Sequence, residues 1–76
     1  MFNIPAVNLT ATGQNIIKLR TERGLSVRDL QAVFGFATPQ AIYKWQRGAD
    51  LPTIDNLVIL ARIFRVTLDE IVVVEE

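Results

Sequence analysis

The stretch FGFATPQAIYKWQRG, residues 34–48, decides the fold of this chain of 76 residues. Gly35 interrupts an apolar pattern, and Thr38 followed by Pro39 restarts it. A Thr side chain can cap the first turn of a helix, and proline is well tolerated at the first helical position. The stretch therefore predicts a helix over residues 38–47.

This helix is expected to have one buried side and one exposed side. Ile42 and Trp45 lie three residues apart, so they share a face that would anchor the helix to the core. The remaining side chains then point outward, and these are Gln40, Ala41, Tyr43, Lys44 and Arg47.

Capping residues and glycines predict two helices before this one. Thr12 would cap a first helix that ends near Gly24, a residue that readily adopts the left-handed conformation at a helix end. Ser26 with Asp29 three residues later resembles a capping box, and Gly35 would end the helix that this box begins. Residues 34–48 thus belong to two helices joined by a short turn.

Two further helices are expected after residue 48. Pro52 and Thr53 would begin the fourth, and Thr67 with Glu70 forms a full capping box for a short fifth helix. The fourth helix has a broad apolar face made of Ile54, Leu57, Val58, Leu60, Ala61 and Phe64.

Both ends of the chain favour strands, residues 6–10 at the start and the β-branched residues 72–75 at the finish. We expect these ends to pair antiparallel, within one chain or across a dimer. The fold class is therefore mainly all-α, a compact five-helix domain with short terminal β-strands. The expected divisions of this single domain, residues 1–76, are an arm at 1–11, a helical core at 12–71 and a tail at 72–76.

Composition excludes several functions. Half of the residues are hydrophobic and the net charge is zero, which is typical of a folded chain. The chain has no Cys and no His, which excludes thiolate nucleophiles and thiolate metal sites, and it shows no Gly-rich phosphate loop or nucleophile elbow. We therefore expect neither an enzyme nor a cofactor or metal site. It shows no signal peptide, and its longest apolar run, residues 57–61, is far too short to cross a membrane. A cytoplasmic location follows as an expectation.

The charges are divided along the sequence. Residues 1–48 contain six basic and two acidic residues, a net charge of +4, whereas residues 49–76 contain two basic and six acidic residues, a net charge of −4. This division favours a basic half that binds nucleic acid, although ordinary surface charge could also produce it.

Two helices joined by a tight turn are the arrangement that places a second helix in the major groove of DNA. An outward Gln40 could pair with adenine and Lys44 with guanine. Arg47 would reach a phosphate, and so would Ser26 and Arg28 at the start of the preceding helix. Polar residues on a helix are also often a solvated face, and that interpretation stays open.

Residues 13–72 resemble the lambda repressor and Cro-like helix-turn-helix family, often called the Xre family. The matching segments are IIKLRTERGLSVRDL, FGF, AIYKWQRG, LPTIDNLVILARIF and VTLDEIV. The resemblance implies sequence-specific binding of double-stranded DNA by a small prokaryotic or phage-type transcriptional repressor. It also implies a homodimer on a palindromic operator with half-sites about one helical turn apart.

The resemblance assigns roles to particular residues. The implied base contacts are Thr38, Pro39, Gln40, Ala41 and Lys44. The implied phosphate contacts are Ser26, Arg28, Tyr43 and Arg47.

The chain departs from the family pattern at several positions. Val27 stands where the family usually has Gln. Gln46 replaces a Glu that usually forms an ion pair with an Arg of the first helix, so we expect a charge-assisted hydrogen bond between Gln46 and Arg20. The segment between Gly35 and Ile42 is one residue longer than in the phage repressors.

Ile59 and Ile63 fall outside the main apolar sector of the fourth helix, so something should cover them. The candidates are the terminal strands of the same chain or a second subunit. An alternative function is a protein-interaction module, such as an antitoxin or an adaptor, that uses the same fold to bind a protein partner.

Overall fold

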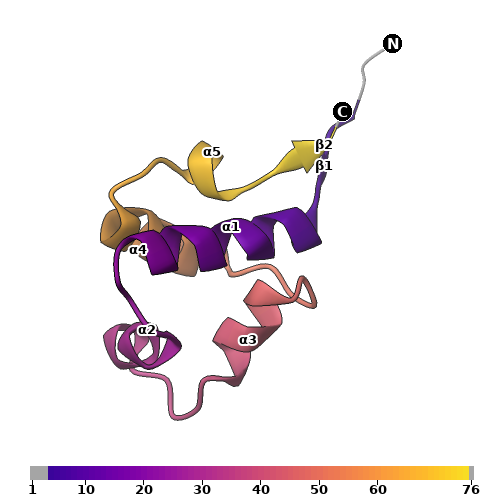
Figure 1. The fold of residues 1–76 in the computed structure, drawn as a ribbon. Helices are drawn as coiled ribbons and strands as arrows, with labels where there is room; N and C mark the ends of the chain where they lie inside the picture. The colour runs from indigo at the N-terminus through magenta and orange to yellow at the C-terminus, as the bar shows by residue number, and fades with distance from the viewer. Residues whose placement is uncertain (1–3, 76) are drawn as a thin grey trace.

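The computed structural model describes residues 4–75, which form five helices and two short strands (Figure 1). In chain order the elements are β1 (Ala6–Val7), α1 (Leu9–Glu22), α2 (Val27–Phe34), α3 (Gln40–Gln46), α4 (Ile54–Phe64), α5 (Leu68–Ile71) and β2 (Val74–Glu75). The prediction of a mainly helical fold with five helices and two terminal strands is confirmed.

Helix α1 runs through the middle of the molecule (Figure 1). Helices α2 and α3 lie on one side of it, and α5 and the strands lie on the other. Within residues 4–75 the core contains nine buried apolar residues, drawn from all five helices: Ile16, Leu19, Leu30, Ile42, Trp45, Leu57, Leu60, Phe64 and Ile71. Ile42 and Trp45 are thus buried as predicted, so one face of α3 packs in the core.

Helix α1 begins earlier than predicted. The side chain of Asn8 accepts a hydrogen bond from the backbone N–H of Ala11 at 2.9 Å, so Asn8 is the cap. The capping role predicted for Thr12 is wrong, because Thr12 lies inside the helix and is only 1% exposed. Its hydroxyl oxygen accepts a hydrogen bond from the Val73 N–H at 2.9 Å and so fixes the C-terminal segment to α1.

The two ends of the chain pair antiparallel within one chain, with Ala6 opposite Glu75 and Val7 opposite Val74. One of the two predicted ways of pairing is therefore observed. The predicted extent of the first strand, to residue 10, is wrong because the chain turns helical at Leu9. The division of the domain at residue 12 therefore does not coincide with the start of α1, and the single-domain assignment stays a prediction.

Helix α3 is shorter than the predicted span of residues 38–47. Its first helical hydrogen bond runs from the Tyr43 N–H to the Pro39 carbonyl at 3.1 Å, and the helix begins at Gln40. The residue at the cap position is Pro39, whose ring has no acceptor, so the capping role predicted for Thr38 is wrong.

The capping predictions at α2, α4 and α5 are confirmed, whereas the second strand is shorter than the predicted residues 72–75 and spans only Val74–Glu75. Ser26 and Asp29 form a capping box at α2, and the Glu70 carboxylate accepts a hydrogen bond from the Thr67 N–H at 3.3 Å at α5. Thr53 caps α4 through the Asn56 N–H at 3.3 Å.

Helix α4 buries only part of its predicted apolar face. Leu57, Leu60 and Phe64 are at most 5% exposed, whereas Ile54 is 64% and Val58 is 44% exposed. Packing against the rest of the domain covers one side of the helix and leaves the other in solvent. Among the described residues, no helix is both long enough and apolar enough to span a membrane.

Candidate nucleic-acid interface

Helix α3 lies directly against the backbone of α1 at Gly13. A Cβ atom at this buried position would sit 2.3 Å from the Trp45 carbonyl oxygen and 2.5 Å from that of Gln46. These distances are well below van der Waals contact, so only glycine allows the two helices to cross this closely. Sequence reasoning did not single out Gly13, because a glycine inside a helix gives no local signal of a crossing.

A hydrogen bond between side chains fixes the end of α3 to α1. The Arg20 Nε donates to Gln46 Oε1 at 3.0 Å, and Arg20 Nη1 donates to the Leu25 carbonyl at 2.9 Å. The predicted hydrogen bond between Arg20 and Gln46 is therefore confirmed. One partly buried guanidinium thus joins α1, the turn before α2 and the last residue of α3.

Three aromatic rings hold α3 against α2. Phe34 and Phe36 are stacked with ring centroids 5.1 Å apart, and Trp45 packs edge-on against them at 5.4 and 5.9 Å. Phe34 ends α2, Phe36 lies in the turn and Trp45 belongs to α3. The cluster therefore couples the conformation of the turn to the position of α3.

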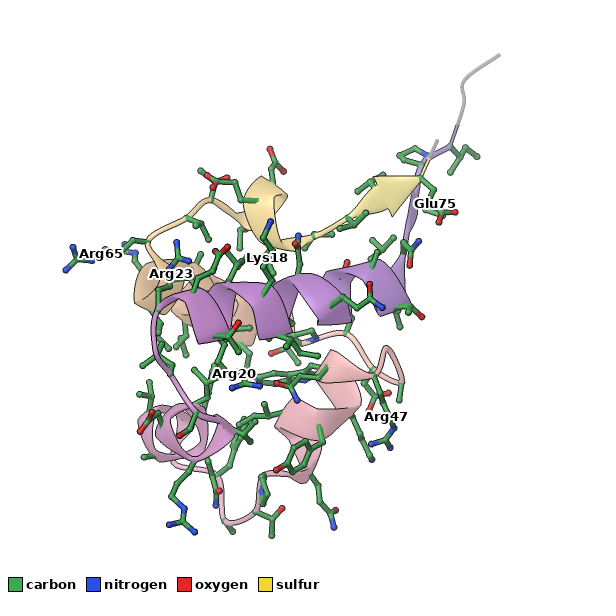
Figure 2. The ribbon with its side chains drawn as sticks, viewed as in Figure 1. Lys18, Arg20, Arg23, Arg47, Arg65 and Glu75 are labelled. Atoms are coloured by element: carbon green, nitrogen blue, oxygen red, sulfur yellow. The ribbon has the colours of Figure 1, made fainter. Side chains whose placement is uncertain are left out.

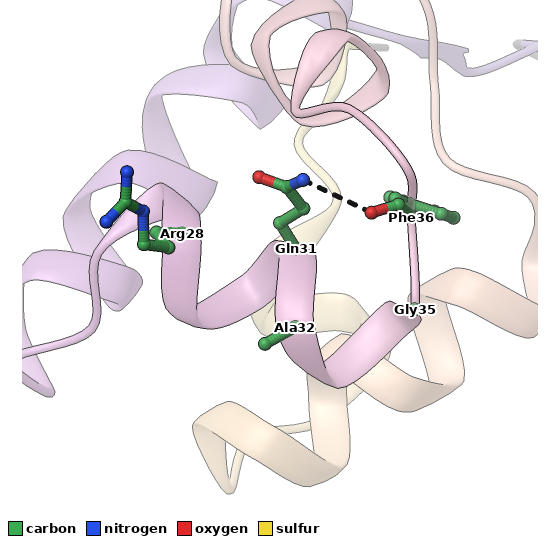
Figure 3. A pocket seen from close by; sticks show the side chains of 5 residues that line it. All are labelled: Arg28, Gln31, Ala32, Gly35 and Phe36. Carbon is green, nitrogen blue, oxygen red and sulfur yellow. Dashed lines mark hydrogen bonds between the residues drawn. The ribbon is translucent and has the colours of Figure 1, made fainter.

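Gln31 adds a second constraint on the turn. The Phe36 N–H donates to the Gln31 carbonyl at 3.1 Å, and the Gln31 side chain donates to the Phe36 carbonyl at 3.2 Å (Figure 3). Gly35 between them has a φ of 69°, in the left-handed region that glycine adopts without strain. The N–H and the carbonyl of Phe36 thus both form hydrogen bonds with Gln31 of α2.

The outward side of α3 is polar and forms a shallow hollow. Lining this hollow of about 320 Å³ are Gln40, Tyr43, Lys44 and Arg47. All four side chains are exposed, and Tyr43 is 48% exposed. Four of the predicted DNA-contacting residues therefore lie together on one surface, in a region that the core and α1 hold in place.

The other three residues predicted to contact bases do not line this hollow. Thr38 is exposed in the turn, whereas Pro39 and Ala41 are half-buried. Ala41 also packs against the core, so part of its methyl surface is covered.

The start of α2 is a second polar surface, with Ser26 and Arg28 both exposed. The Ser26 N–H donates to the Asp29 carboxylate at 2.8 Å, and the Asp29 N–H donates to the Ser26 hydroxyl oxygen at 3.0 Å. Hydrogen bonds from the Ser26 backbone, and then from its side chain, lower the pKa of Asp29 below 3.8. The capping box thus uses two backbone donors that a phosphate could otherwise bind.

Fewer basic side chains are free than the charge of residues 1–48 suggests. Arg20 is bound to Gln46 and Leu25, and Arg23 donates to the Phe64 carbonyl and pairs with Glu22 at 3.4 Å. Lys18 lies on the side of α1 that faces α5, away from α3 (Figure 2). The exposed basic residues on α2, on α3 and directly after α3 are Arg28, Lys44 and Arg47 respectively.

Comparison with known proteins identifies this arrangement. A family model described as helix-turn-helix matches residues 16–71. The chain belongs to the helix-turn-helix family. The match is to the group that includes the lambda repressor and Cro, the Xre type, so the resemblance in the sequence is confirmed. Members of this group are DNA-binding transcription regulators, and this helix-turn-helix protein is of that type.

Two solved structures share the fold of this helix-turn-helix protein. They are a crystal structure of the DNA-binding domain of BldD and the BldD DNA-binding domain of S. venezulae, each with a TM-score of 0.71 and 23% sequence identity. Both similarities cover 86% of this chain, and they cover 93% and 96% of the two BldD domains respectively. No curated protein matches the chain.

Proposed function

We propose that this protein binds double-stranded DNA sequence-specifically as a transcriptional repressor, with α3 in the major groove. The observation that carries the proposal is the division of α3 into two sides. Ile42 and Trp45 are at most 4% exposed, while the opposite side presents a continuous polar surface. A helix held in this way can enter a groove without losing its own contacts with the core.

The chemistry of this polar surface fits base recognition. Gln40, at the start of α3, has the amide geometry that pairs with adenine, and Lys44 can donate to guanine. Thr38, Pro39 and Ala41 would border these contacts, because they flank Gln40 in the sequence.

Phosphate contacts would position the helix on the DNA. Arg47 directly follows α3, and Tyr43 shares the same hollow, so both could reach the backbone beside the groove. At the start of α2, Arg28 supplies charge and the Ser26 hydroxyl can still donate its proton. The Asp29 carboxylate lies beside them, so we expect Arg28 to contribute more than Ser26.

We further propose that the protein acts as a homodimer on a palindromic operator. The family match and the similarity to the BldD domains, which are DNA-binding domains by name, support DNA as the partner. The homodimer itself is what the resemblance to the lambda repressor and Cro-like family implies. Two copies related by a two-fold axis would present their α3 helices to half-sites about one helical turn apart.

Selection from random double-stranded DNA, at two salt concentrations, tests the proposed function. We expect a two-fold symmetric motif and an affinity that falls steeply with added salt, because bound phosphates release counterions. A folded protein that selects no sequence would contradict the proposal and favour the protein-interaction module. Such a module would bind its partner with little dependence on salt.

A further inference from the structure

Helix α4 carries an exposed surface that the proposed DNA contacts do not use. Val58 is 44% and Ile59 is 38% exposed, and Asp55 and Arg62 are exposed beside them. We call these four residues the α4 stripe. The apolar side chains of Leu51 and Ile54, 37% and 64% exposed, border its N-terminal end.

The α4 stripe is a single face of the helix. At about 100° per residue, its four members fall within about 100° of the circumference. Leu57, Leu60 and Phe64 lie on the opposite side, where they are buried. Ile63 is half-buried and packs against the core, so of the two isoleucines predicted to need a cover only Ile59 belongs to the stripe.

The terminal strands do not cover this face. β1 and β2 are paired with each other in the same chain, and Val58 and Ile59 keep the exposures given above. Val58 and Ile59 are neighbours on this face, so their exposed apolar surface is a candidate for an interface.

The charges of the α4 stripe are arranged symmetrically about its apolar centre. Asp55 stands three residues before Val58, and Arg62 stands three residues after Ile59. They are about 10 Å apart along the helix, too far to pair with each other. Within residues 4–75 neither of them takes part in a salt bridge.

We infer that the α4 stripe binds the α4 stripe of a second copy of this chain, with the two helices antiparallel about a two-fold axis. An axis between Val58 and Ile59 sets the Val58 of each copy against the Ile59 of the other. It also sets each Asp55 against the Arg62 of the other copy. A two-fold interface requires that each contact be made twice in this way.

The order of charges favours a second copy over an unrelated partner. One acidic and one basic residue at equal distances from the centre make the α4 stripe complementary to an antiparallel copy of itself. A partner of another sequence would not need this symmetry. The inference rests on the homodimer of the proposed function and specifies which surface forms it.

In the absence of DNA, the contact between two α4 stripes should be weak and reversible. Helix α4 has 11 residues, about 16 Å of length, so the buried area falls below the roughly 1,000 Å² of a stable interface. Two copies bound to adjacent half-sites would have a high effective concentration, which would strengthen the contact on DNA.

Disulfide cross-linking of the free protein tests the inference, because the chain has no cysteine of its own. We expect a mixture of Val58→Cys and Ile59→Cys chains at high micromolar concentration to form covalent dimers in a mild redox buffer. Val33→Cys is the control, since Val33 is 58% exposed on α2. Equal yields of dimer from the mixture and from the control would overturn the inference.

Charge reversal tests the antiparallel register in the same cross-linking assay. Asp55→Arg or Arg62→Asp alone should lower the yield several-fold, and the two changes together in one chain should restore it. Asp69→Arg is a matched control, because Asp69 also lies in the first turn of a helix but outside the stripe. Failure of the combined change to restore cross-linking, in chains with normal thermal melts, would refute the register.

These measurements use no DNA, so their outcome does not depend on whether the protein binds DNA. If the protein selects a DNA sequence but does not cross-link, only the proposed α4 interface is contradicted. Strong cross-linking by a protein that selects no DNA sequence would support the α4 interface and contradict the proposed repressor function.

Discussion

The Nε of Arg20 lies 3.0 Å from Oε1 of Gln46, and this contact joins the second half of α1 to the last residue of α3. The same guanidinium also binds the Leu25 carbonyl at 2.9 Å. Because the donor is charged and partly buried, the hydrogen bond should be stronger than a neutral one. It therefore helps to set the orientation of the helix that we propose reads DNA.

Replacing Gln46 should reveal the strength of this contact. We expect Gln46→Ala to lower the free energy of unfolding by about 1–3 kcal/mol, because it leaves a partly buried Arg20 donor without its partner. Gln46→Glu should keep or raise stability, since it offers Arg20 an ion pair, and any gain should shrink at high salt. Urea denaturation of these variants and of Arg20→Ala, alone and combined with Gln46→Ala, gives the coupling energy. A coupling near zero would show that the contact does not stabilise the fold.

Gly13→Ala should destabilise the protein although alanine favours helices. Inside a helix this substitution would normally raise the free energy of unfolding by about 1 kcal/mol. Here the new methyl group would meet the Trp45 carbonyl oxygen at 2.3 Å, so we expect a net loss of about 1–3 kcal/mol and a displaced α3. Thermal unfolding measures the effect, with exposed Gln14→Ala as the control on the same helix. A more stable Gly13→Ala protein would contradict the close crossing of α1 and α3.

Lys44→Ala and Arg47→Ala should weaken DNA binding without affecting stability, since both side chains are exposed. We expect a loss of about 1–3 kcal/mol with relaxed sequence preference for Lys44→Ala. For Arg47→Ala we expect a uniform loss and a salt dependence reduced by about one phosphate contact. Binding is measured on selected DNA at several salt concentrations.

Lys18→Ala is the matched control for both changes, because Lys18 faces α5 rather than α3 (Figure 2). Equal effects of all three substitutions would mean that only overall charge matters, and α3 would then not be the reading helix.

The capping box at α2 should make stability depend on pH in the acid range. The pKa of Asp29 is lower in the folded protein than its unfolded value of 3.8, so the ionised carboxylate stabilises the fold. This contribution is complete above pH 3.8 and is lost as the pH falls through the lower, folded pKa.

We therefore expect Asp29→Ala to be less stable than the unchanged protein near neutral pH, with a difference that shrinks in stronger acid. Denaturation curves over this range measure it, with Asp50→Ala in the loop before α4 as the control. A difference that stays constant with pH would exclude the capping carboxylate as its cause.

Thr12→Val should loosen the C-terminal segment. The substitution preserves shape but removes the oxygen that accepts the Val73 N–H, and we expect a loss of about 1–3 kcal/mol. Hydrogen exchange at the Val73 amide should accelerate. Thr12→Ser retains the acceptor and should protect that amide as the unchanged protein does, so faster exchange in Thr12→Ser would point to packing rather than to the hydrogen bond.

The features that the sequence predicted correctly depend on residues close together in the chain. Ser26 and Asp29 satisfy each other within one turn of helix, and Gly24 and Gly35 adopt the left-handed conformation expected at helix ends. Ile42 and Trp45 were placed in the core by their spacing alone. The partner of Arg20 was predicted from the resemblance to a family rather than from a local pattern.

The wrong predictions occurred where two local choices were nearly equal. Asn8 and Thr12 are both good capping residues. Asn8 caps the helix, whereas Thr12 lies inside it and accepts a hydrogen bond from Val73, 61 residues away. At α3 the pair Thr38 and Pro39 suggested an early start, but the helix begins only at Gln40.

The sequence by itself determined the number and order of the helices, most of their caps and the polar character of α3, because these depend on hydrogen bonds and periodicity within a few residues. Tertiary structure alone decided that Arg23 is not free, since its side chain donates to the carbonyl of Phe64, 41 residues away. It also decided which face of α4 remains open, because burial depends on neighbours that are distant in the chain. Val58 fits the apolar pattern of the core, yet no other part of the described chain buries it.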